Sequence, residues 1–100
     1  MYAQASVISS PQIRRKIMKL LYFAWVRERV GNESETRDIP ADVTTIGALK
    51  TWLASLDEGY AYAFENPEII RVALDKTLAE DDAPLGDAQE AAFFPPMTGG

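Results

Sequence analysis

The end of the chain carries the group best suited to chemistry, a free terminal carboxylate. The last eight residues are Phe93, Phe94, Pro95, Pro96, Met97, Thr98, Gly99 and Gly100. Because glycine has no side chain, the last two residues could thread a passage too narrow for others and bring that carboxylate into another protein's site. Proline fixes its own φ, so the two prolines would stiffen the base of the tail. We expect residues 97–100 to project as an extended tail; a frayed, inert end is the alternative.

The side chains of the remaining sequence offer few catalytic groups. The chain contains no cysteine and no histidine, which excludes disulfides, Cys/His zinc sites, Ser-His-Asp triads, cysteine nucleophiles and imidazole bases. Glu80, Asp81 and Asp82 are adjacent carboxylates, but they lack the alternating oxygen ligands and the glycine of a calcium loop. We therefore predict a solvated acidic turn at these residues and no metal site.

Length, composition and charge restrict the class of protein further. One hundred residues with 47% hydrophobic content fit one small globular domain. A net charge of −5 disfavours nucleic acid and favours a basic protein surface as partner, or simply keeps a small domain in solution. No apolar run approaches the roughly 20 residues that cross a bilayer, and the N-terminus lacks the charge order of a secretory signal. We expect a cytoplasmic protein that has no membrane partner.

Hydrophobic periodicity divides the chain into three parts. Residues 1–17 have no sustained period and end in a basic cluster, so we expect a flexible arm or a non-native extension. Residues 18–96 are expected to form the domain, and residues 97–100 form the tail.

The first part of the domain is predicted to be a hairpin. The apolar run at 18–25 is too short for a stable lone helix and favours a strand buried on both faces. Gly31-Asn32 then supplies turn chemistry, and the alternation over 34–39 predicts a half-exposed return strand.

The main helix is predicted to begin at Thr44 or Thr45, either of which can cap it. Apolar residues follow at spacings of three and four, namely Ile46, Leu49, Leu53 and Leu56. This stripe would bury one face of the helix, and we expect Lys50 to lie on the solvated side.

The second half of the domain is predicted to be mostly strands. For residues 58–67 a short helix, a loop and a strand are all possible. Residues 69–74 and 77–79 are predicted to be two short strands joined by a tight turn at Asp75-Lys76, and the apolar run 91–94 is predicted to be the last strand.

This order of elements predicts the fold. The first and last strands are the most apolar, so they should be neighbours at the sheet centre, with the helix crossing one face. We therefore predict an α+β protein of the β-grasp, ubiquitin-like type, in which a mixed sheet has one main helix across one face.

Several segments of the chain match one known family. They are Leu21-Tyr22-Phe23-Ala24, Val26-Arg27-Glu28, Val30-Gly31, Val72-Ala73-Leu74, Thr77-Leu78, Pro84-Leu85 and the closing AFFPPMTGG from Ala92. Through them, residues 18–100 resemble the small, sulfur-carrying subunit of molybdopterin synthase, the MoaD family. Thiamin-pathway sulfur carriers share the fold and the Gly-Gly end but usually lack the Phe-Phe-Pro-Pro lead-in. The chain departs from the family pattern at Asp87-Ala88-Gln89-Glu90, where Asp-Gly-Asp-Glu is common, and at Asp75, where asparagine is common; a positive φ at Ala88 would strain that turn.

The resemblance implies a sulfur carrier that is not an enzyme by itself. An E1-like adenylating enzyme would activate the Gly100 carboxylate with ATP, and sulfur transfer would then give a thiocarboxylate. That group would donate sulfur to a pterin precursor within the large subunit of molybdopterin synthase. ATP is then consumed by the activating partner, and no cofactor is bound permanently. The alternatives are a thiamin-type sulfur carrier, a ubiquitin-like modifier conjugated through Gly100, and a binding domain with an inert tail.

The resemblance also implies a surface that binds the large subunit. The residues expected to take part are Phe23, Arg27, Leu78, Phe94, Pro95 and Pro96, with Met97, Thr98 and Gly99 threading into the partner's site. Since neighbouring residues of a strand point to opposite faces, we expect Phe93 to be buried and Phe94 to be the exposed one. Taken singly, each apolar residue of this set could equally be a core residue, and Arg27 could simply be solvated.

Overall fold

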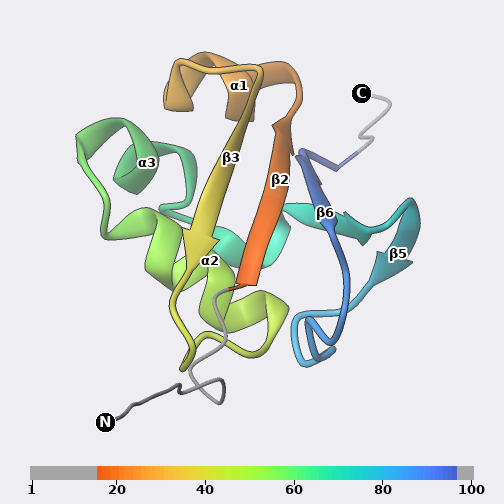
Figure 1. The fold of residues 1–100 in the computed structure, drawn as a ribbon. Helices are drawn as coiled ribbons and strands as arrows, with labels where there is room; N and C mark the ends of the chain where they lie inside the picture. The colour runs from red at the N-terminus through yellow and green to blue at the C-terminus, as the bar shows by residue number, and fades with distance from the viewer. Residues whose placement is uncertain (1–15, 97–100) are drawn as a thin grey trace, which may run out of the picture.

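A five-stranded mixed sheet organises the chain, and its strand order is β3-β2-β6-β4-β5. The computed structural model describes residues 16–96 (Figure 1). Its elements are β2 (Lys16–Tyr22), α1 (Ala24–Val30), β3 (Ser34–Ile39), α2 (Ile46–Ala54), α3 (Glu58–Ala63), the 3-10 helix η1 (Pro67–Ile69), β4 (Arg71–Leu74), β5 (Thr77–Ala79) and β6 (Glu90–Phe94). No helix within residues 16–96 is long and apolar enough to span a membrane.

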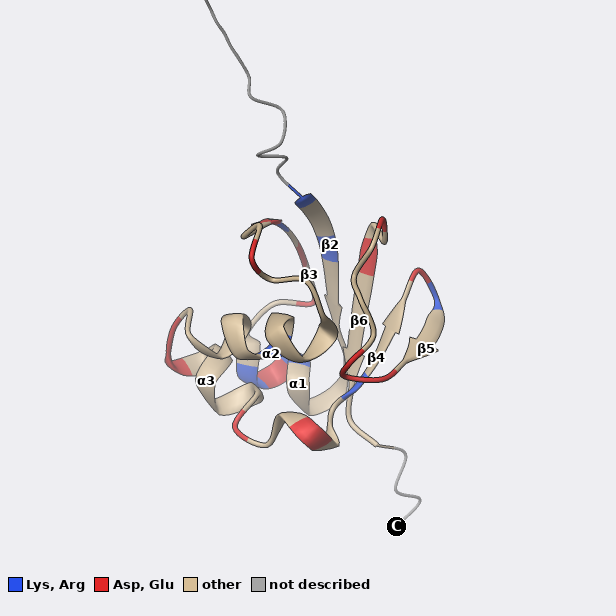
Figure 2. Ribbon diagram, turned by 90° about the horizontal axis from the view of Figure 1, so that it is seen from below, with Lys and Arg blue, Asp and Glu red and all other residues tan. Residues whose placement is uncertain are grey.

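The first and last strands are neighbours at the centre of the sheet, as predicted. β2 and β6 pair in parallel, whereas β3 pairs antiparallel with β2, and β4 pairs antiparallel with both β5 and β6. Helices α2 and α3 lie against one face, and the sheet strands β3 and β2 lie in front of α2 in Figure 1. Figure 2 shows the same layers from another side, with many acidic residues in the surrounding loops and turns. The predicted α+β architecture, a mixed sheet with a main helix across one face, is confirmed.

Two expectations for the first strand were wrong. β2 begins at Lys16, so residues 16 and 17 belong to the sheet and not to the expected arm; residues 1–15 lie outside the described part of the chain. The strand is buried on one face only, because Met18, Leu20 and Tyr22 point into the core while Ile17 is 59% exposed. Leu21 between them is half-buried. The first strand therefore alternates between side chains that are buried in the core and side chains on a partly exposed outer face, where Ile17 and Leu21 are apolar.

A short helix, α1, lies between the two strands of the expected hairpin, where the end of the first strand and the connecting segment were predicted. The chain leaves β2 through Phe23 and turns at Ala24, whose φ of 54° lies in the left-handed region that non-glycine residues rarely adopt. The helix ends at Gly31, which has a φ of 91° and donates its N–H to the carbonyl of Arg27 at 2.8 Å. Strands β2 and β3 still pair as predicted, but through a strand–helix–strand connection.

Helix α2 begins at Ile46, directly after Thr45, one of the two predicted capping residues. Thr45 caps it, because its Oγ1 accepts a hydrogen bond from the backbone N–H of Ala48 at 3.1 Å. The predicted stripe of Ile46, Leu49 and Leu53 is fully buried. Leu56 lies beyond the end of the helix and is half-buried against the core.

The ambiguous segment 58–67 forms the helix α3, followed by the start of η1. Asp57 Oδ1 caps α3 by accepting the N–H of Tyr60 at 3.1 Å. Gly59 allows α3 to pack closely on α1, since a Cβ there would meet the carbonyl oxygen of Arg29 at 2.8 Å. The alternation of aromatic residues in this segment is thus not that of a strand.

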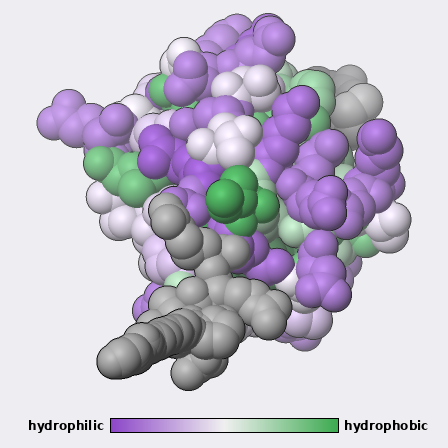
Figure 3. Space-filling view, in the orientation of Figure 1, coloured by the Kyte–Doolittle hydropathy of each residue, from purple (hydrophilic) through white to green (hydrophobic). Residues whose placement is uncertain are grey.

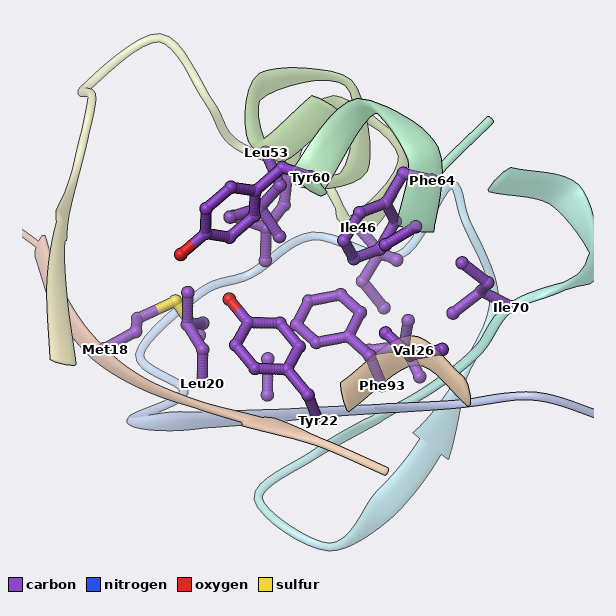
Figure 4. Packing of buried hydrophobic residues seen from close by; sticks show 14 of the residues in the cluster. Met18, Leu20, Tyr22, Val26, Ile46, Leu53, Tyr60, Phe64, Ile70 and Phe93 are labelled. Atoms are coloured by element: carbon purple, nitrogen blue, oxygen red, sulfur yellow. The ribbon is translucent and has the colours of Figure 1, made fainter. Parts of the chain in front are cut away.

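Four aromatic rings form the centre of the core between the sheet and the helices (Figure 4). The rings of Tyr22 and Phe93 stack with centroids 5.7 Å apart, and Phe64 meets Phe93 edge-on at 5.4 Å. Tyr60 meets Tyr22 edge-on at 6.4 Å. These contacts attach the last strand to the first strand and to the region of α3, which fixes the position of β6.

A polar cluster on β3 lies at the edge of this core. Glu35 Oε2 accepts hydrogen bonds from the hydroxyls of Tyr22 at 2.8 Å and Tyr60 at 2.7 Å, and Glu35 Oε1 lies 3.2 Å from Arg37 Nε. Burial alone raises the pKa of Glu35, but the two tyrosine hydrogen bonds and the nearby arginine outweigh it, so this pKa lies below the ordinary value of 4.5.

The lowered pKa predicts a pH-dependent contribution of Glu35 to stability. The folded state binds the Glu35 proton more weakly than the unfolded state, so the stabilisation is present above pH 4.5 and is lost as pH falls through the folded-state pKa. At neutral pH we expect Glu35→Gln to lower the free energy of unfolding by about 1–3 kcal/mol. The gap should shrink below pH 4.5, as measured by urea unfolding over a pH series. The exposed Glu28 offers a control, Glu28→Gln; a gap for Glu35→Gln that is the same at every pH would contradict the prediction.

Candidate functional site

The last strand determines where the tail leaves the domain. β6 ends at Phe94, and the half-buried Pro95 and Pro96 follow it. Because β6 runs parallel to β2, its C-terminal end lies beside the C-terminal end of β2, where α1 begins (Figure 1). The predicted tail residues Met97, Thr98, Gly99 and Gly100 lie outside the described residues.

The two phenylalanines of β6 point to opposite faces, as predicted. Phe93 is completely buried in the aromatic core, whereas Phe94 is only half-buried on the other face. The carbonyl of Phe93 accepts the N–H of Phe23 at 3.0 Å, and Phe94 pairs with Arg71 of β4. Phe23 therefore lies beside the end of the strand that leads into the tail.

Apolar residues cross the helix-free face of the sheet near the tail. We define this outer face by the half-buried or exposed side chains on the side opposite α2. Strand register aligns Leu21 with Ala92, Ala92 with Ala73, and Ala73 with Leu78 across four strands. Phe23 is 46% exposed and Leu78 is 58% exposed. Figure 3 shows this face as mostly hydrophilic, with hydrophobic surface in separate areas.

The structure brings some of the predicted binding residues together and separates others. Phe23 and Arg27 line one shallow depression of about 380 Å³, along with residues of β2 and the loop before β3. Phe23 and Phe94 directly follow the paired residues Tyr22 and Phe93, so they lie at the same end of the two neighbouring strands. Leu78 lies on the same face but on the far side of β4, at the sheet edge. Phe23, Arg27 and Phe94 thus lie near the point where the tail leaves the domain. Leu78 extends the predicted set along the outer face to β5.

Lys50 was expected to lie on the solvated side of α2, and this expectation was wrong. Its side chain is only 2% exposed, and the ammonium donates three hydrogen bonds, to Pro67 O at 2.8 Å, Ile70 O at 2.7 Å and Asp81 Oδ1 at 2.7 Å. All three donors are therefore used. The sequence contained a signal for this, because Lys50 follows Ile46 by four residues and lies within the apolar stripe. One residue of the acidic turn 80–82 is thus an ion-pair partner within the domain.

Asp75 was considered only for its backbone, but its side chain connects two parts of the sheet. Asp75 and Lys76 have φ values of 47° and 73°, which suit the two central residues of a tight hairpin turn. Asp75 Oδ1 accepts the N–H groups of Gln89 and Glu90, both at 3.0 Å. The turn before β6 takes its positive φ, 53°, at Gly86 and not at Ala88. The departure from the usual pattern at Ala88 therefore causes no strain there.

The fold and the outer face define a β-grasp, ubiquitin-like protein. Its last strand, β6, lies at the centre of the sheet and is followed within a few residues by the end of the chain. Solved structures agree. Small archaeal modifier protein 1 from Haloferax volcanii is similar with a TM-score of 0.62 and 25% identity, over 84% of this chain and 99% of that chain. The HVO 2177 protein of Haloferax volcanii is similar with a TM-score of 0.63 and 26% identity, over 85% of this chain and 89% of that chain.

Sequence comparison places the chain in one family. The model of the ThiS family matches residues 20–100. The molybdopterin synthase sulfur carrier subunit of Escherichia coli strain K12 is 40% identical over 84 residues, which are 84% of this chain and all of that protein. The subunit of the same name from Haemophilus influenzae is 32% identical over the same shares. The chain belongs to the ThiS family and, within it, to the molybdopterin synthase sulfur carrier subunits.

Proposed function

We propose that this chain is the sulfur carrier subunit of molybdopterin synthase and that it carries sulfur on the carboxyl group of Gly100. The observation that supports this most is the 40% identity that extends over the complete length of the Escherichia coli subunit. The chain is not an enzyme by itself; it acts as the sulfur-donating part of a complex. We expect it to work in the cytoplasm.

Chemistry at Gly100 begins with activation, because a carboxylate is a poor electrophile. An E1-like adenylating enzyme is the proposed activator. The carboxylate oxygen attacks the α-phosphate of ATP, pyrophosphate leaves, and an acyl-adenylate forms. A donor of sulfide-level sulfur then attacks the acyl carbon, AMP leaves, and the product is a thiocarboxylate. In the large subunit the thiocarboxylate sulfur forms a bond to the pterin precursor, and water then cleaves the acyl C–S bond, so the sulfur stays on the precursor and the Gly100 carboxylate is regenerated. ATP is consumed by the adenylating enzyme during activation.

The domain's role is to bind the large subunit and to direct the tail. Phe23, Leu78 and Phe94 are the proposed apolar contacts, since all three have apolar side chains that are at least partly exposed on the outer face, Phe23 and Phe94 beside the tail's exit and Leu78 at the sheet edge. Arg27, beside Phe23, is proposed to pair with an acidic group of the partner. Pro95 and Pro96 would direct the tail, and Met97, Thr98 and Gly99 would thread into the partner's site.

Truncation of Leu78 is expected to weaken binding of the large subunit. A buried apolar contact in the middle of an interface contributes about 1.4 kcal/mol or more, so we expect Leu78→Ala to raise the Kd about tenfold. The matched control is Ile17→Ala. Ile17 is 59% exposed, against 58% for Leu78. It lies on the same face of the sheet, near the start of β2 and so at the end of that strand away from Phe23. Calorimetry with the large subunit measures both; equal effects of the two substitutions would contradict the proposed binding surface.

Mass spectrometry tests the proposed function directly. The full chain is incubated with ATP, the adenylating enzyme of the same organism and a sulfur source. We expect a mass increase equal to the replacement of one oxygen by sulfur, and no increase when ATP is omitted. A mass that stays unchanged under complete conditions would overturn the proposal. Conjugates to lysine on gels would instead support a modifier role, which the likeness to small archaeal modifier protein 1 makes worth testing.

A further inference from the structure

Strand β5 carries Leu78, yet it is the least extensive strand of the sheet. It has three residues and lies at the edge, so it is paired on one side only, with β4. Three residue pairs in a ladder hold such a strand weakly, because an edge strand has no second neighbour. Contacts outside the ladder must therefore contribute to the position of Leu78.

The end of β5 that leads into the acidic turn is fixed by helix α2. The backbone carbonyl of Asp81 accepts the N–H of Gly47 at 2.8 Å, and its carboxylate accepts a hydrogen bond from Lys50 at 2.7 Å. A Cβ on Gly47 would meet that carbonyl oxygen at 3.3 Å, so the two segments are in close contact. This end of the strand is attached to the core.

The other end of β5 is fixed through Asp75. Its carboxylate oxygen Oδ1 accepts both N–H groups of Gln89 and Glu90 at 3.0 Å, and its own N–H donates to the carbonyl of Glu90 at 3.0 Å. Glu90 is the first residue of β6. One side chain in the β4–β5 turn thereby connects the edge hairpin to the strand that ends at the tail.

We propose that Asp75 is a positioning residue that holds β5, and with it Leu78, in the arrangement that the large subunit recognises. This inference rests on the proposed function, since it assumes that Leu78 contacts the partner. Asp75 itself need not touch the partner. Its effect on binding passes through Leu78, because the carboxylate fixes the turn only three residues before Leu78.

A double-mutant cycle in the full chain tests the proposal, with Kd for the large subunit as the readout. We expect Asp75→Ala to raise the Kd about fivefold to tenfold in the wild-type background. In the Leu78→Ala background the same substitution should change the Kd by less than about twofold, because the contact that it positions is already absent. Asp75→Asn should bind like wild type, since an amide oxygen also accepts N–H groups and asparagine tolerates positive φ. Asp82→Ala removes an exposed charge near β5 and is the charge-matched control.

Each other result overturns a different part of the inference. Equal effects of Asp75→Ala in both backgrounds would show that Asp75 does not act through Leu78. Similar losses for Asp75→Asn and Asp82→Ala would assign the effect to charge. Amide hydrogen exchange decides the structural step without the partner: Asp75→Ala should speed exchange at residues 77–79 but not in β2, and unchanged exchange would overturn the positioning role. If Leu78→Ala leaves binding intact while exchange responds as expected, the proposed binding surface fails and the role of Asp75 in holding β5 stands.

Discussion

A chain that ends at Gly99 is expected to acquire no detectable sulfur under conditions that load the full chain. Removal of Gly100 withdraws the carboxylate by one residue, about 3.3–3.6 Å. Misplacement of a reacting group by about 1 Å already costs around a hundredfold in rate, so the loss should be close to complete. The measurement is the mass of the chain after incubation with ATP, the adenylating enzyme and a sulfur source.

Two controls show that the loss is specific to the tail. Urea unfolding of the shortened chain should match that of the full chain, because the core ends at Phe93 and the described domain at Pro96. Gly99→Ala keeps the carboxylate at its normal position but adds a methyl group to the segment that must thread into the partner. We expect it to slow loading while still giving product. Normal loading of the shortened chain would show that the position of the carboxylate is not what the activating enzyme recognises.

Replacement of Lys50 by alanine is expected to cause the largest loss of stability among single polar substitutions in the domain. It leaves the buried carbonyl of Ile70 and the partly buried carbonyl of Pro67 without their donor, removes the partner of Asp81, and creates a cavity. Loss of one partner from such a network costs about 3–5 kcal/mol, and we expect about 3 because Asp81 is half-exposed. Urea unfolding measures this change.

Lys50→Met separates the packing of the lysine stem from its charge. Methionine refills most of the cavity, and no ammonium has to be desolvated, so we expect a smaller loss of about 1–2 kcal/mol from the two unsatisfied carbonyls. The control is Lys19→Ala, at an exposed lysine of β2, which should change stability little. An unfolding free energy for Lys50→Ala close to that of Lys19→Ala would contradict the buried network.

The strongest sequence patterns correctly predicted the parts of the fold that depend on burial. The stripe Ile46, Leu49 and Leu53 gave α2, and strict alternation gave the opposite orientations of Phe93 and Phe94. Helix α1 escaped prediction because it has seven residues and only Val26 is fully buried, which is too little to establish a helical period. It also follows β2 after a single residue, so its apolar residues seemed to continue the strand.

The parts of the site that sequence reasoning missed depend on contacts between distant residues. The bonds of Lys50 to Pro67 and Asp81, and of Asp75 to Glu90, join segments whose meeting only the folded sheet determines. The proposed large-subunit contacts came from family resemblance. The structure places Phe23, Leu78 and Phe94 on one face with at least partly exposed side chains. It adds that Leu78 lies apart from Phe23 and Phe94, at the edge of the sheet.

The central place of β6 has a consequence for the synthesis of the protein. Its neighbours are β2, which is synthesised long before it, and β4, so the sheet cannot close until the ribosome has released the last strand. Pairing between such distant segments is slow to nucleate. A nascent chain, or one that ends before β6, therefore lacks both the stable domain and the Gly100 carboxylate, and cannot be loaded with sulfur. Topology in this way couples completion of translation to competence for sulfur transfer.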